Sequence, residues 1–160
     1  MLTAKQVAEY FLSKDKEHKL FNKNIVIYNN RKSYEGNIRI NKYLFLAQVV
    51  HIAKYGVCLF SDEFVAYDNG PVIEDIMHSY GRLIYNSVDN NIEKKDKDFL
   101  DKIYFSLENA TYADLIEITH DDPEWQNLSN RTLNAPKMNL EKNAEIYKKK
   151  YKGLIEALKI

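Results

Sequence analysis

The sequence has one cysteine, Cys58, among its 160 residues, so no disulfide can form within the chain. It also has only five glycines and three prolines. The glycine-rich loops that cradle phosphates are missing, and so is the Gly-x-Ser-x-Gly elbow that exposes a nucleophilic serine. These absences leave the chain without a recognisable nucleotide site or nucleophile motif.

The sequence has no excess of either charge. Lys and Arg total 23, Asp and Glu total 23, and the formal net charge is zero. Binding to a phosphate backbone needs a clustered excess of basic side chains, so we do not expect nucleic acid as the main partner. One basic cluster is present at 148–152, and we interpret it as a solvated helix face. Of the three functional hypotheses that we consider, a DNA-binding autoregulator ranks last.

No hydrophobic run is long enough for a membrane helix. The most apolar stretch, Tyr43–Ala53, is far shorter than the roughly 20 residues that span a bilayer. The first residues, Met1–Phe11, include Lys5 and Glu9 where a signal peptide would be apolar. We therefore predict a cytoplasmic protein with no membrane partner.

The length falls within the range of one domain, and no shift in composition divides the chain. A chain of this size can bury a core without disulfides or a structural metal. We predict one domain over residues 1–160 and no cofactor.

Most of the chain shows helical periodicity, with apolar residues three and four positions apart. Capping signals mark three helix starts: Thr3 with Gln6, Thr111 with Asp114, and Asp122 before Pro123. We also read Pro71 as the first residue of a helix that ends at Gly81, Gly56 as a C-terminal cap, and Asn139 as the cap of the last helix. The expected helices cover residues 3–13, 38–55, 71–80, 99–107, 112–119, a short turn from 123, and 140–158.

Two short runs favour β structure. Ile25–Tyr28 lies in a polar stretch that we read as a long loop with a short hairpin, which Asn29 and Asn30 could turn. Phe64–Tyr67 is the clearest strand, and it is closed by 68–71. The predicted fold is mainly α: a compact helical bundle with one small β element, formed by short strands near residues 25–28 and 64–67.

Two groups of residues permit a catalytic or metal-binding hypothesis. A Cys/His pair would need His51 and Cys58 in contact, yet Cys58 sits between apolar neighbours as a small buried hydrophobe would. His120, Asp121 and Asp122 could act in a hydrolase or ligate a metal, but no other ligand lies at a recognised spacing. We predict no metal site and no catalysis, and keep a hydrolase using His120 with Asp121 or Asp122 as the alternative.

Two segments together resemble a known family. The first runs from Ile40-Asn41-Lys42-Tyr43-Leu44 through Tyr55-Gly56 to Ala66-Tyr67-Asp68-Asn69-Gly70-Pro71-Val72. The second is Leu115-Ile116-Glu117-Ile118-Thr119-His120-Asp121-Asp122-Pro123-Glu124-Trp125. Their order and spacing are similar to the Panacea domain, and the resemblance is strongest over 38–128. Tyr67 and Asn69 stand where members of that family commonly carry Trp and Tyr.

The resemblance implies a mostly helical domain found in phage-associated proteins and in antitoxins that neutralise toxins by direct binding. It makes a cognate toxin the expected partner. Relatives similar to the antitoxin SocA act as adaptors that deliver their toxin to a cytoplasmic protease, which makes such a protease a second possible partner.

We expect the two segments to form one face that contacts the partner or holds the contact surface in shape. A rigid turn at Gly70 and Pro71 would place this face. Trp125 has two interpretations, as a core anchor or as a surface anchor. The candidate partner-binding residues are Tyr67, Asp68, Asn69, His120, Asp122 and Trp125.

Overall fold

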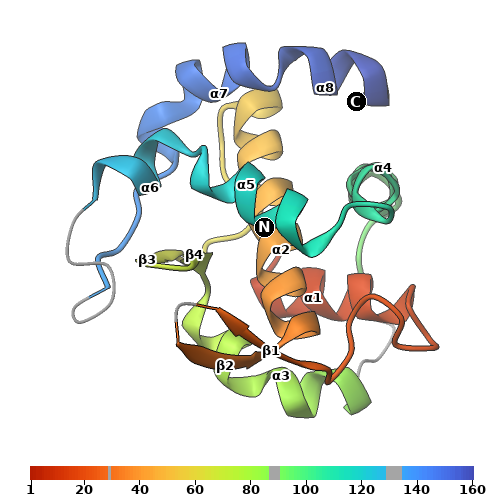
Figure 1. Cartoon of the computed structure of the whole chain (residues 1–160). Coiled ribbons are helices and arrows are strands. Elements are labelled where there is room, and N and C mark those ends of the chain that lie inside the picture. Colours follow the sequence, from red (N-terminus) through yellow and green to blue (C-terminus); the bar gives the residue numbers. More distant parts are fainter. Residues whose placement is uncertain (29, 87–90, 129–134) are drawn as a thin grey trace.

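The computed structural model describes residues 1–28, 30–86, 91–128 and 135–160. One long helix, α2 (Glu35–Tyr55), runs through the middle of the molecule, and most of its residues are buried. It is in contact with α1 (Ala4–Ser13), α3 (Glu74–Asn86), α4 (Lys94–Leu107), α5 (Tyr112–His120) and α7 (Ala144–Lys150) (Figure 1). Helices on nearly every side explain why its sequence is apolar all round. The mainly α fold is confirmed.

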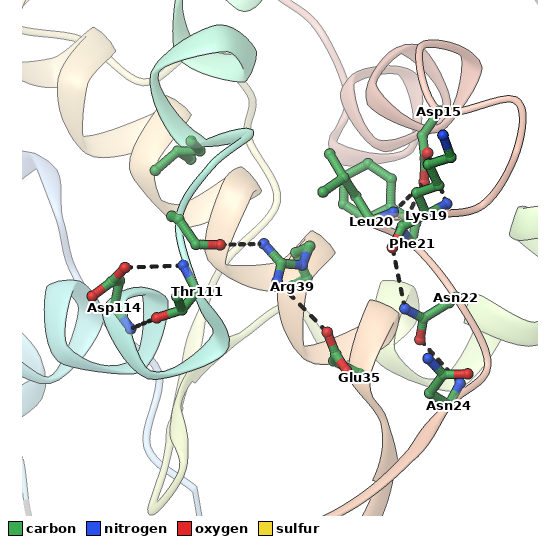
Figure 2. Close-up of polar contacts among 12 residues, drawn as sticks. Asp15, Lys19, Leu20, Phe21, Asn22, Asn24, Glu35, Arg39, Thr111 and Asp114 are labelled. Atoms are coloured by element: carbon green, nitrogen blue, oxygen red, sulfur yellow. Dashed lines mark hydrogen bonds and ion pairs between the residues drawn. The ribbon is translucent and has the colours of Figure 1, made fainter.

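The predicted caps are present at three helix starts. The Thr3 hydroxyl accepts a hydrogen bond from the Gln6 amide at 3.1 Å, and the Gln6 side chain accepts one from the Thr3 amide at 2.9 Å. Thr111 and Asp114 make the same reciprocal pair at the start of α5 (Figure 2). Asp122 caps the short helix α6 (Pro123–Asn127) by accepting from the amide of Trp125. Gly56 ends α2 with a φ of 76°, as expected for a left-handed cap.

Both strand predictions are confirmed, and each strand belongs to an antiparallel hairpin. β1 (Ile25–Tyr28) pairs with β2 (Arg31–Tyr34). β3 (Val65–Tyr67) pairs with β4 (Gly70–Val72). Asn29, predicted to help turn the first hairpin, lies outside the described residues. The β1–β2 hairpin and α3 lie at one end of α2, and α7 crosses the other end (Figure 1).

The prediction that Pro71 begins a helix is wrong. Pro71 lies in β4, where it faces Ala66, and α3 begins at Glu74. Proline has no amide hydrogen, and an edge strand such as β4 tolerates that loss. The amide of Ile73 donates to the Asn41 side chain at 3.0 Å, so a residue of α2 provides the polar contact at the start of α3. The segment 67–71 is therefore a hairpin turn and not a strand-to-helix turn.

Other helix boundaries also differ from the prediction. α2 begins three residues earlier than expected, α3 continues through Gly81 to Asn86, and α4 begins at Lys94. Gly81 is tolerated inside α3 because helical geometry does not exclude glycine but only makes it less favourable.

The last helix is broken. A 3-10 turn, Glu141–Asn143, precedes α7, and a break at Tyr151 separates α7 from α8 (Lys152–Leu158). Asn139 therefore does not cap the last helix, and its amide donates instead to the Glu124 side chain at 3.3 Å.

The loop between α1 and β1 is organised by one buried carboxylate. Asp15 accepts hydrogen bonds from the amides of Lys19, Leu20 and Phe21 at 2.7–3.0 Å (Figure 2). Phe21 can thus enter the core, where its ring packs edge-on against Tyr43 of α2. Within the described ranges, no helix is both long and apolar enough to cross a membrane.

Candidate functional site

The structure brings together the two segments that the sequence analysis singled out. The indole Nε1 of Trp125 donates to the backbone oxygen of Tyr67 at 2.7 Å, across 58 positions of sequence. The His120 ring lies almost parallel to the Trp125 ring, with 4.2 Å between their centroids. Trp125 is only 8% exposed, which supports its interpretation as a core anchor. The β3–β4 turn and the α5–α6 junction therefore form one unit.

Asp122 is fully buried behind this unit and has two structural bonds. Its Oδ2 accepts from the Trp125 amide at 2.9 Å, and its Oδ1 accepts from the Tyr147 hydroxyl of α7 at 2.7 Å. Burial raises the pKa of Asp122, and these two hydrogen bonds oppose the rise. Burial, together with the Asp122 carboxylate, raises the pKa of Tyr147 as well. Asp122 thus ties α7 to the α5–α6 junction.

The neighbouring carboxylate is also engaged. Lys150 Nζ lies 3.1 Å from Asp121 Oδ2 and donates to the Asp121 backbone oxygen at 2.6 Å. One lysine of the 148–152 cluster therefore has a partner within the protein. With both Asp121 and Asp122 bonded to structural groups, the geometry gives little support to a hydrolase that needs one of them to orient His120.

The outer part of the unit is the tip of the β3–β4 hairpin. Asp68 is exposed, and Tyr67 and Asn69 are half-buried. The Tyr67 hydroxyl donates to Glu74 at 2.6 Å, and the Arg31 guanidinium lies 5.8 Å from the centre of the Tyr67 ring. Burial and the Glu74 carboxylate raise the pKa of Tyr67 to about 12, so its hydroxyl stays protonated and keeps donating at neutral pH. We name Tyr67, Asp68, Asn69 and His120 the turn face.

Lys42 of α2 lies beneath this turn, and it was not among the candidate residues predicted from the sequence. Its side chain is 2% exposed, and its Nζ donates to the backbone oxygen of Asn69 at 2.9 Å. Burial lowers the pKa of Lys42 to about 7. The available signal was a lysine directly before the apolar run Tyr43–Ala53, because lysine is almost never fully buried without a partner.

Gly70 fits against Lys42 because it lacks a side chain. Its φ is 116°, and a Cβ there would collide with Lys42 Nζ and stand 3.3 Å from Thr119 Oγ1. Glycine alone adopts this conformation readily and lets α2, the turn and α5 approach one another. The expectation that Gly70 occupies a special backbone conformation is confirmed.

His51 and Cys58 do not form an activated pair. His51 Nδ1 lies 2.8 Å from the backbone oxygen of Val57, and burial lowers the pKa of the ring. Burial and the nearby Glu141 raise the pKa of the Cys58 thiol to about 12, the opposite of the shift that activates a nucleophile. Cys58 is half-buried, less enclosed than predicted. Among the described residues, no three His, Cys, Asp or Glu side chains gather as a metal site would require.

The site is thus a buried polar framework, built from Lys42, Asp122 and Trp125, beneath an exposed hairpin tip. A scan against protein-family models matched residues 40–126 to the antitoxin SocA-like, Panacea domain. The match covers more than half of the chain, and the chain belongs to this family. It includes Lys42, the β3–β4 turn and Trp125. Searches of curated proteins and of solved structures found no match.

Proposed function

We propose that this protein is an antitoxin-like binding module that neutralises a cognate toxin by direct contact. The observation that carries the proposal is the family match, which runs from α2 through α6 and includes the whole turn face. The family also supports a non-enzymatic role. The geometry is in keeping with it, because the buried carboxylate of Asp122 holds structure together.

The turn face is the contact surface we propose. Asp68 is exposed at the hairpin tip, and Tyr67 and His120 are half-buried beside it, so a partner that covers the tip would touch polar groups and ring surface. Asp122 and Trp125 belong to the same site in a supporting role, since both are buried and bond to the segments that carry the face.

The first experiment asks whether a toxin exists. Genes that overlap or abut this one would be expressed alone and together with it, and growth would be measured. The proposal expects one neighbour that arrests growth alone, is harmless when co-expressed, and copurifies with this protein. If every toxic neighbour remained toxic on co-expression, the proposal would be wrong.

The second experiment locates the contact. Asp68→Arg reverses a charge at the hairpin tip, and we expect at least a tenfold loss of toxin affinity in a variant whose far-ultraviolet circular dichroism spectrum shows the native fold. Asp98→Arg, at an exposed position on α4, is the matched control and should bind as the wild type does. Equal affinity of both variants would remove the turn face from the proposal and leave toxin binding itself standing.

Delivery to a protease is the finer form of the proposal. An adaptor should shorten the half-life of its toxin, whereas a simple inhibitor should lengthen it or leave it unchanged. A pulse-chase measurement of the toxin with and without this protein distinguishes the two.

A further inference from the structure

A buried ammonium group without a counter-ion lies under the turn face. Lys42 Nζ makes one hydrogen bond, to the backbone oxygen of Asn69, although an ammonium group has three hydrogens to donate. In the part of the chain that the structure describes, no carboxylate lies within 4.0 Å of it. Burial of an uncompensated charge is costly, so such a residue is uncommon in a purely structural role.

Lys42 also lines a small pocket. Its volume is about 60 Å³, and it lies between α2, β2 and the β3–β4 hairpin. Arg31, an exposed residue, lines the pocket together with Lys42, so the pocket reaches the surface. Arg31 also lacks an ion pair with any described carboxylate, and its guanidinium lies against the Tyr67 ring. Two basic residues thus line one cavity. Its remaining polar side chains include Ser33, Asn37 and Asn41.

We propose that this pocket binds a single carboxylate group, held between the Lys42 ammonium and the Arg31 guanidinium. Both groups donate hydrogen bonds only, and a guanidinium matches the two oxygens of a carboxylate. The volume accepts a group of this size but not a nucleotide or a drug-sized ligand, whose sites measure roughly 300–1,000 Å³.

The surrounding charges favour an anion. Arg31 on β2 is positive, and Tyr67 on β3 stays protonated with its hydroxyl bonded to Glu74. His120 on α5 approaches Gly70 from the same side as Lys42, since its Cδ2 would stand 3.5 Å from a Cβ at Gly70. Only the ammonium form of Lys42 attracts a carboxylate, so binding and protonation of Lys42 support each other.

The carboxylate can come from a free small acid or from a polypeptide. The existence of the pocket does not depend on the proposed function. Use of the pocket by a toxin's acidic side chain would rest on it, because Lys42 lies directly beneath the proposed contact surface.

Acetate is the probe for the first test. The protein, labelled with ¹³C at its lysines, would be titrated from pH 5 to pH 10 with sodium acetate or with sodium chloride at equal ionic strength. We expect acetate to raise the Lys42 titration midpoint by at least half a pH unit, with an affinity that falls about tenfold per pH unit above the midpoint measured in chloride. Equal midpoints in the two salts would overturn the proposal.

Two variants assign the effect to the pocket. Arg31→Gln changes an exposed residue, so the fold should survive, and acetate affinity should fall several-fold. Lys42→Met has no Lys42 resonance, so acetate binding to it is followed by the backbone amide resonances of the pocket residues, and it should be absent. Lys148→Met, on the exposed side of α7, is the matched control and should bind acetate normally. Undiminished acetate binding in Arg31→Gln and in a folded Lys42→Met would overturn the assignment.

A final experiment distinguishes a free small acid from a polypeptide as the source of the carboxylate. N-acetyl-aspartate methylamide carries a side-chain carboxylate on a short backbone. If it shifts the Lys42 resonance as acetate does, the pocket accepts a polypeptide carboxylate. If acetate alone shifts the resonance, the pocket is supported as a site for a free small acid.

Discussion

At the scale of single residues, the site depends on a glycine whose replacement would strain the backbone. Gly70 combines a φ of 116° with a position where a Cβ would collide with Lys42. We expect Gly70→Ala to lower the free energy of unfolding by about 2–4 kcal/mol, through backbone strain and overpacking. Urea denaturation measures this loss.

Gly81 provides the control for that substitution. It lies within α3 with open space around it, so Gly81→Ala should raise the free energy of unfolding by about 0.5–1 kcal/mol. Similar destabilisation by both substitutions would show that the close approach at Gly70 is not what makes glycine necessary.

Lys42 gives the protein a predictable pH dependence. Its pKa is about 7 in the folded protein and ~10.4 in an unfolded chain. Between these values unfolding takes up a proton, so the Lys42 term adds to stability as pH rises from about 7 to about 10. Lys42→Met removes this term.

The measurement is the difference in unfolding free energy between wild type and Lys42→Met at several pH values. It should change in favour of the wild type by up to about 1.4 kcal/mol per pH unit in this window. Lys148→Met should show the wild-type profile. A constant difference between wild type and Lys42→Met would contradict the expectation.

At the scale of elements, Asp15 holds the loop that leads from α1 to the first hairpin. Asp15→Ala removes three hydrogen bonds to one carboxylate and leaves the buried Phe21 amide without an acceptor. We expect a loss of about 3 kcal/mol in unfolding free energy. Asp98→Ala, which breaks only a surface pair with Lys94, should leave the urea midpoint nearly unchanged.

The bond between Tyr147 and Asp122 joins α7 to the α5–α6 junction. Tyr147→Phe keeps the ring but takes one donor from a buried carboxylate, which should cost about 1–3 kcal/mol of unfolding free energy. Thermal unfolding checks this, with Tyr55→Phe as the control because Tyr55 is 53% exposed. An unshifted melting temperature in Tyr147→Phe would mean that this bond adds nothing to stability.

The helix boundaries that the sequence predicted correctly are set by contacts between residues close together in the chain. The boxes at Thr3 and Thr111 bond residues three positions apart, so a short segment contains the whole signal. The end of α2 at Gly56 is local in the same way. By contrast, α3 begins where a side chain from α2 reaches the Ile73 amide, and Pro71 pairs in a hairpin instead. No local pattern contains that contact.

The candidate site shows the same division. The sequence patterns predicted that the turn and the His120–Trp125 segment belong to the site, and the Trp125 indole joins the two in the structure. These patterns did not select Lys42, Arg31 or Tyr147, because each gains its role from a residue at least 25 positions away. Whether the turn face contacts a partner remains a prediction.

At the scale of the whole molecule, we predict one cooperative domain. The only tryptophan, Trp125, is bonded to β3 and stacked on α5, so its fluorescence reports on the site, whereas far-ultraviolet circular dichroism reports on all the helices. In a two-state protein the two signals give the same urea midpoint. A lower midpoint for fluorescence would show that the site unfolds separately and that the chain is not one cooperative unit.

Because other helices cover α2, its amide hydrogens should exchange with solvent far more slowly than those of α8. Amide hydrogens in the middle of α2 are covered by helices on nearly every side, so they can exchange with deuterium only when the whole protein unfolds. α8 has no fully buried residue, and its amides should exchange by local fraying within a much shorter time. The slowest exchange rates in α2 therefore report the global free energy of unfolding. A ligand in the pocket beside Lys42 would slow them further, whether or not it touches α8.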